Sequence, residues 1–102
     1  MIRARFFVSE GAFTGFELSG HAGLAESGRD VACAAVSSAV QLTVNLLDEF
    51  GCEPDVKVGN DLICCRTEAE DRSSRIISRL RQHFEAVLEE FPNTIKITIS
   101  EV

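Results

Sequence analysis

Apolar and polar residues alternate at the start of the chain, and this pattern predicts a pair of β-strands. Segment 2–8 is one strand by its period of two. Segment 13–20 repeats the alternation after a short turn that contains Gly11. Because two such runs joined by a glycine-containing turn pair with each other, we expect an antiparallel hairpin here. The buried face of its first strand is formed by Ile2, Ala4, Phe6 and Val8.

A helical pattern follows between Asp30 and Gly51. Apolar residues recur there every three to four positions, as on the buried stripe of a helix. Asp30 is a favoured N-cap residue and Gly51 a favoured C-cap residue. We therefore expect a helix that follows Asp30 and extends through Phe50. The stripe consists of Val36, Val40, Val44, Leu47 and Phe50.

A second helix is expected to begin near 67–71 and to end before Pro92. Thr67 and Glu70 have the spacing of a capping box, which would satisfy the first backbone N–H groups of this helix. Proline cannot continue a helix, so Pro92 supplies the end. The apolar stripe consists of Ile77, Leu80, Phe84, Val87, Leu88 and Phe91.

Three further strands complete the pattern. Segments 56–58 and 62–66 flank the turn residues of 59–61 and form a hairpin by their turn chemistry. Segment 94–100 carries three isoleucines on one predicted face. The element order β-β-α-β-β-α-β predicts an α+β fold, a single domain over 1–102 with two helices packed on a mixed sheet, because that arrangement hides both helical stripes.

Composition narrows the functional classes. The chain has 102 residues, 45% of them hydrophobic, which suits one core. Ten basic against sixteen acidic residues give a net charge of −6, which argues against direct binding of nucleic acid. The sequence has no run of about 18 or more apolar residues, so no membrane partner is expected. We interpret Cys33, Cys52, Cys64 and Cys65 as free thiols of a cytoplasmic protein.

Segment 22–29 is small and polar, with Gly23 and Gly28 near its two ends. This composition is typical of a surface loop, and we expect a mobile active-site loop here. Two residues with catalytic potential flank it: His21 precedes the loop and Cys33 follows it.

A cysteine attacks as the thiolate, and its ordinary pKa of about 8.5 leaves only a few per cent in that form at neutral pH. The positive end of a helix favours the thiolate. With Asp30 as N-cap, Cys33 is the third helical residue and lies at that end. His21 can supply the base, because histidine changes charge near neutral pH, whereas His83 falls in the middle of the second helix. Asp30 either caps backbone N–H groups or orients His21.

Structural interpretations of the same residues remain open. Cys33 also fits a packed thiol, because it adjoins the apolar stripe of the helix. His21 also fits an exposed residue at a strand end, and the hydroxyl of Ser37 can bond back to the preceding turn. Metal binding is not predicted, since the sequence has neither a Cys-x-x-Cys nor a His-x-x-x-His pair, and no cofactor is expected.

Two blocks of residues resemble a known signature. Gly20-His21-Ala22-Gly23 and the segment 28–37, which reads Gly-Arg-Asp-Val-Ala-Cys-Ala-Ala-Val-Ser, are similar to the bacterial ribosomal-processing cysteine proteases called Prp. The resemblance implies a catalytic pair of His21 and Cys33, assisted by Asp30. It implies that the substrate is the N-terminal extension of a large-subunit ribosomal protein, and that the enzyme is a homodimer. It also implies that the substrate contacts Gly20, Ala22, Gly23, Gly28 and Ser37.

Two other functions compete with the protease. One is a noncatalytic, peptide-binding factor of ribosome assembly, which would use the same site only as a groove. The other is a thiol redox protein, which would require a second cysteine to approach Cys33. Leu24 departs from the resemblance, because many relatives carry an aromatic residue after the first block. We therefore expect different loop contacts with the peptide.

Overall fold

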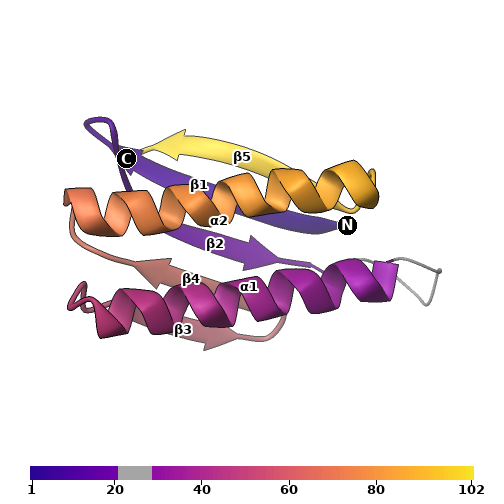
Figure 1. Cartoon of the computed structure of the whole chain (residues 1–102), viewed down its shortest axis with the longest axis horizontal. Coiled ribbons are helices and arrows are strands. Elements are labelled where there is room, and N and C mark those ends of the chain that lie inside the picture. The colour runs from indigo at the N-terminus through magenta and orange to yellow at the C-terminus, as the bar shows by residue number, and fades with distance from the viewer. Residues whose placement is uncertain (21–28) are drawn as a thin grey trace.

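The computed structural model describes the backbone of residues 1–20 and 29–102, and the side chains of 1–20 and 31–102. Its element order is the predicted β-β-α-β-β-α-β (Figure 1). The elements are β1 (Ile2–Ser9), β2 (Ala12–Ser19), α1 (Arg29–Glu49), β3 (Asp55–Gly59), β4 (Leu62–Arg66), α2 (Asp71–Glu90) and β5 (Ile95–Glu101).

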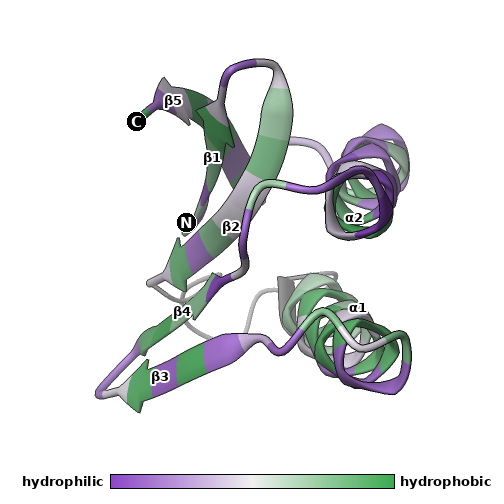
Figure 2. Cartoon of the chain, turned by 90° about the vertical axis from the view of Figure 1, so that its left-hand side faces the viewer, coloured by the Kyte–Doolittle hydropathy of each residue, from purple (hydrophilic) through white to green (hydrophobic). Residues whose placement is uncertain are grey.

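The strands form one mixed sheet in the order β3-β4-β2-β1-β5. β5 runs parallel to β1, and the other neighbours are antiparallel. Both helices lie on the same side of the sheet, which leaves its other face open (Figure 2). The predicted fold class, α+β with two helices packed on a mixed sheet, is confirmed.

Aromatic rings fill the centre of the core between the sheet and α2. The Phe6 ring centroid lies 6.3 Å from that of Phe16 and 6.0 Å from that of Phe84, and all three side chains are fully buried. Such ring pairs stabilise a core beyond the area that they bury. They come from β1, β2 and α2, so this cluster joins both layers of the fold.

α1 is the more apolar of the two helices. By length and composition alone, Val31–Glu49 could cross a membrane, with a mean hydropathy of 1.4. In the structure, Val36, Val40 and Leu47 of this helix are buried in the core. These residues belong to the hydrophobic core, and 28% of the apolar window is buried within the chain.

Two predicted core residues are exposed instead. Phe50, placed on the stripe of the first helix, lies beyond the end of α1 and is 48% exposed. Gly51, with φ of 75°, ends the helix as predicted, and its N–H donates to the carbonyl of Asp48. Ile99, placed on the buried face of the last strand, is 56% exposed. β5 is an edge strand, and α2 packs mainly on β2, so the far part of this face stays uncovered.

The predicted capping box of the second helix is wrong. Glu70 is the N-cap of α2 but makes no capping bond through its side chain. The backbone N–H of Thr67 donates to the carbonyl of Thr14, which holds Thr67 beside the sheet and away from the helix start. Ser73 bonds to this turn instead, with its hydroxyl 3.1 Å from the Glu68 carbonyl and 3.2 Å from the Glu70 carbonyl.

The open face of the sheet contains one buried ring. Phe7 is 4% exposed although it points away from the helices. Arg66 lies across the sheet with its guanidinium carbon 4.0 Å from the Phe7 ring centroid, a cation–π contact. Gly15 stands between them in register with both residues. The arginine can cross the strand because Gly15 has no side chain in its path.

Gly15→Ala is expected to destabilise the protein by about 1–3 kcal/mol, the usual range for an overpacked site. A Cβ at this position would clash with the backbone carbonyl of Cys65 and would lie 3.2 Å from the Arg66 side chain. Chemical denaturation measures the loss. Gly59→Ala is the matched control, because its Cβ would meet only the Leu62 side chain at 3.9 Å, and it should leave stability nearly unchanged. Equal effects of the two changes would contradict this account.

Candidate active site

A cleft of about 390 Å³ opens between α1 and one end of the sheet. One wall is a face of α1, and the other is built from the end of β2 and the hairpin of β3 and β4. Most of its lining is apolar. The lining residues are Ile2, Leu18, Ser19, Gly20, Cys33, Val36, Ser37, Val40, Gln41, Val58, Gly59, Asp61, Leu62 and Ile63.

Cys33 is the only cysteine that lines this cleft among the described residues. Its side chain is half-buried and packs against the core on one side. Ser37 follows one helical turn later, and Val36 and Val40 continue the same wall. Cys33 is therefore a packed thiol on its core side only, because its other side faces the cleft.

The start of α1 differs from the prediction. The helix begins at Arg29, so Asp30 lies inside the first turn instead of at the N-cap. Cys33 is correspondingly the fifth helical residue, not the third. Side chains in a helix lean toward its N-terminus, so a residue at this position covers the preceding turn. The thiol can thus still lie close to the end of the helix, where backbone N–H groups are unpaired.

Gly20 positions the chain at the rim of the cleft. Its φ is 81°, a conformation that favours glycine, and a Cβ would lie 2.7 Å from the carbonyl oxygen of Met1. Its backbone N–H donates to the carbonyl of Asp61 at 3.3 Å, which ties the end of β2 to the hairpin of β3 and β4. The chain therefore leaves the sheet beside the cleft immediately before His21.

The structure brings together Gly20, Cys33 and Ser37 of the predicted site. The backbone of Asp30 belongs to α1. His21, Ala22, Gly23 and Gly28 lie outside the described residues, as does the predicted loop apart from Arg29, which is helical. The catalytic and substrate-binding roles of His21, Ala22, Gly23 and Gly28 are therefore proposals.

The hairpin of β3 and β4 is the part of the site that sequence reasoning missed. Val58, Asp61 and Leu62 line the cleft from this hairpin. They approach Cys33 because β4 pairs with β2, a contact that no local pattern predicts. The sequence held one signal, because the apolar residues Val58 and Leu62 flank a predicted tight turn. In the structure their side chains are 76% and 39% exposed. Apolar side chains that gather into one exposed patch can mark a binding surface.

Other reactive side chains lie elsewhere. His83 lines a groove between the two helices and not the cleft. In the described part of the chain, no group of three His, Cys, Asp or Glu residues could hold a metal ion. Burial raises the pKa of the Cys52 thiol, with a further contribution from a hydrogen bond with Glu70. Burial also raises the pKa of Cys65, with a smaller effect of Cys64, to about 11.

The raised pKa of Cys65 predicts a loss of stability at alkaline pH. The unfolded thiol loses its proton near pH 9, whereas the folded thiol keeps it up to about pH 11. The stabilisation is therefore complete below pH 9 and is lost as the pH rises toward 11, by about 2 kcal/mol. Urea unfolding from pH 8 to 11 should show a smaller decline for Cys65→Ala than for the wild type. Parallel declines would contradict this assignment.

The comparisons with known proteins point to one family. A family model described as cysteine protease Prp matches residues 1–96. No curated protein matches the chain. Among solved structures, the essential ribosomal processing protease Prp from S. aureus, in complex with a covalently linked product peptide, is similar at a TM-score of 0.86. It is 23% identical, over 98% of this chain and 100% of that chain.

Two further structures have the same fold. The S. aureus protease in complex with a substrate peptide is 22% identical, with a TM-score of 0.86, over 98% of this chain and 100% of that chain. SMU.848 from Streptococcus mutans is 23% identical, with a TM-score of 0.84, over 100% of this chain and 96% of that chain. The family model covers nearly the whole sequence. The chain therefore belongs to the cysteine protease Prp family.

Proposed function

We propose that this protein is a cysteine endopeptidase that removes the N-terminal extension of a large-subunit ribosomal protein during ribosome maturation. The observation that carries the proposal is the position of Cys33 on the wall of the cleft, in a chain of the cysteine protease Prp family. The S. aureus relatives were solved with a substrate peptide and with a covalently linked product peptide. They support a peptide as the ligand of the corresponding cleft.

The lining of the cleft suits a peptide with apolar side chains. Leu18, Val36 and Val40 give it an apolar wall, and burying an apolar side chain there is favourable. Ser37 and Gln41 add polar groups that can pair with a peptide backbone. We propose that Gly20 and Ser37 contact the substrate, together with Ala22, Gly23 and Gly28.

In the proposed mechanism, Cys33 is the nucleophile and His21 is the base. The imidazole of His21 accepts the thiol proton, and the sulfur attacks the carbonyl carbon of the scissile peptide bond. The tetrahedral intermediate collapses to a thioester as the C–N bond breaks, and the imidazolium returns the proton to the leaving amine. A water molecule, deprotonated by His21, then hydrolyses the thioester and releases the second product.

Two groups can assist this pair. Backbone N–H groups at the start of α1 can stabilise the negative oxygen of the tetrahedral intermediate, which is usually a large catalytic term. Asp30 can orient the imidazole of His21, as the acid of a catalytic triad does. This role is compatible with the position of Asp30 in the first helical turn, because the residue is not at the N-cap.

The test is cleavage of the host's own ribosomal protein by the purified enzyme. Sequencing the new N-terminus of the product should reveal one cut near the start of that protein. A noncatalytic assembly factor would bind the same protein and leave it intact. Binding without any cut would therefore favour the alternative and contradict the proposed function.

We further propose that the enzyme acts in the cytoplasm as a homodimer. The four cysteines are not joined in disulfides, which is consistent with a reducing compartment. One chain has a mass of 11.1 kDa, so sedimentation or light scattering distinguishes one copy from two. A mass of a single chain at micromolar concentration would contradict the dimer and would leave the cleavage proposal unaffected.

A further inference from the structure

The face of the sheet opposite the helices gathers half of the chain's basic residues. On β1, the residues that alternate with the buried Ile2, Ala4 and Phe6 are Arg3 and Arg5, and both are exposed. Register places residues of the other strands on the same face. Of ten lysines and arginines in the chain, five belong to this surface, which we call the basic sheet face: Arg3, Arg5, Lys57, Arg66 and Lys96.

Three of these basic residues adjoin one another. Arg3 stands in register with Lys96 on the neighbouring strand, and Arg5 follows two positions along β1. Neighbouring strands are about 5 Å apart, and alternate residues of a strand are about 7 Å apart. The three residues surround a shallow hollow of about 270 Å³, whose other lining residues are Glu17, Ser19 and Thr98.

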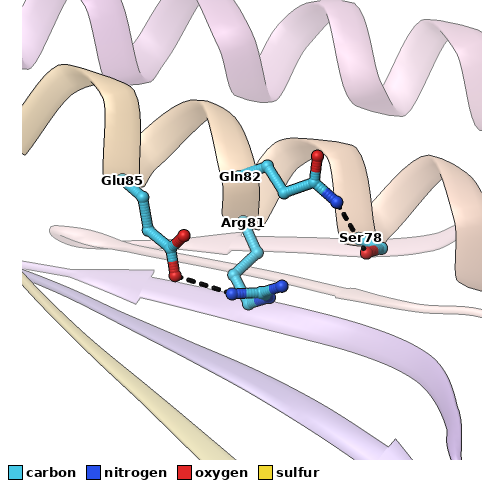
Figure 3. Close-up of polar contacts among 4 residues, drawn as sticks. All are labelled: Ser78, Arg81, Gln82 and Glu85. Carbon is cyan, nitrogen blue, oxygen red and sulfur yellow. Dashed lines mark hydrogen bonds and ion pairs between the residues drawn. The ribbon is translucent and has the colours of Figure 1, made fainter.

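Glu17 stands in register with Arg5 and is, among the described residues, the one acidic residue that lines the hollow. The side chains of Arg3, Arg5 and Lys96 make no hydrogen bond or ion pair with any residue that the structure describes. The arginines of α2 differ. Arg81 is 2.6 Å from Glu85, one turn along the same helix (Figure 3), and Arg75 is 3.7 Å from Asp71.

The acidic residues on the face are fewer than the basic ones. Glu17 and Asp55 are the acidic residues of the paired strands that lie on the basic sheet face, whereas five residues there are basic. The face is therefore positive in a chain whose net charge is −6. Net charge is an average over the whole surface, whereas the binding of a polyanion depends on the electrostatic potential at its own site.

Other partners fit this face poorly. A second copy would set one positive face against another, which is repulsive. A membrane surface favours apolar side chains that enter the lipid, but Phe7 at the centre of the face is covered by Arg66. The proposed substrate, a ribosomal protein, belongs to a class that binds RNA and is itself basic.

We propose that the basic sheet face binds the phosphate backbone of RNA. Arginine forks pair with phosphate oxygens, and the hydroxyls of Ser19 and Thr98 can donate to them. The face offers no exposed aromatic ring for base stacking among its described residues, so the binding is insensitive to base sequence. The choice of RNA over another polyanion rests on the proposed function, in which the substrate assembles with ribosomal RNA.

The position of the hollow relative to the cleft supports this arrangement. Ser19 at the end of β2 lines both of them, so the two sites meet at this residue. RNA on the basic sheet face would lie beside the cleft. An N-terminal extension that leaves an RNA-bound ribosomal protein could thus reach Cys33 over a short path.

The test measures binding of the full-length protein to a labelled RNA duplex of about 20 base pairs, by fluorescence anisotropy. With three phosphates neutralised, affinity should fall roughly 40-fold between 50 and 200 mM salt. Arg3→Glu with Lys96→Glu should weaken binding roughly tenfold or more and reduce the salt dependence. Glu17→Gln should strengthen binding, a gain that loss of folding cannot produce.

The matched control is Arg75→Glu with Arg79→Glu, which changes the net charge equally on the exposed surface of α2. It should bind RNA like the wild type. Absence of RNA binding, or equal losses in the two double variants, would overturn the proposal. Binding to phosphatidylglycerol vesicles but not to RNA would also overturn it and would identify a membrane surface as the partner.

Peptide cleavage separates this proposal from the proposed function. Arg3 and Lys96 do not line the cleft, so their double variant should cleave a short extension peptide at the wild-type rate. If the wild type binds RNA but cleaves no peptide, the proposed function fails and the RNA surface remains. If it cleaves peptide but binds no RNA, only the RNA surface fails.

Discussion

Cys33→Ala is expected to abolish cleavage of the ribosomal protein, lowering kcat by a factor of about 10⁴ or more, because no other group can form the thioester. The side chain is half-buried on the cleft wall. Removing its sulfur should therefore change the free energy of unfolding by no more than about 1 kcal/mol. The measurement pairs single-turnover cleavage with urea denaturation of the same preparation.

Cys64→Ala is the control for this change. Cys64 is also half-buried but lies on the open side of the sheet, outside the cleft. The Cys64→Ala variant should retain full cleavage activity. Cleavage by pure Cys33→Ala protein would contradict the assignment of the nucleophile, and loss of activity in Cys64→Ala would show that the assay responds to any lost thiol.

His21→Ala is expected to lower kcat by roughly 10²–10⁴-fold, the usual contribution of a general base. Melting temperature should change little, because the residue follows the end of β2 and is not part of that strand. The chain offers a matched control in its second histidine. His83→Ala should cleave like the wild type, since His83 lines the groove between the helices and not the cleft.

Comparison of the two histidine variants tests whether His21 is the catalytic base. Equal activity of His21→Ala and the wild type would remove the base from the mechanism. A large loss in His83→Ala would indicate that the groove between the helices contributes to substrate binding or to assembly. Rates should be measured at saturating and at low substrate concentration, because a lost base lowers kcat whereas a lost contact raises KM.

Local patterns predicted the fold well because each element has its own signal. Alternation defined β1, helical spacing defined the buried side of α2, and turn residues located the hairpin of β3 and β4. The errors fall where tertiary structure decides. Ile99 has the pattern of a core residue, but it lies on an edge strand that the helices do not fully cover. Thr67 has the spacing of a cap, but its backbone joins the sheet.

The site was predictable in part. Cys33 was identified from its place near a helix start, and that estimate of the start was two residues late. The contribution of the β3–β4 hairpin could not be predicted, because it depends on pairing of β4 with β2 across more than forty residues. The basic sheet face was missed for a similar reason. Arg3 and Lys96 lie at opposite ends of the sequence and meet only through the parallel pairing of β1 and β5.

The central claim is that the thiol of Cys33 attacks the substrate. The most direct measurement uses a peptide that ends at the mapped cleavage site and carries an electrophilic group in place of the scissile bond. Mass spectrometry of the digested adduct should find one electrophilic peptide per chain, attached to Cys33. Adding substrate beforehand should prevent this attachment. Attachment to Cys64 instead, or turnover that continues after Cys33 is fully modified, would contradict the account.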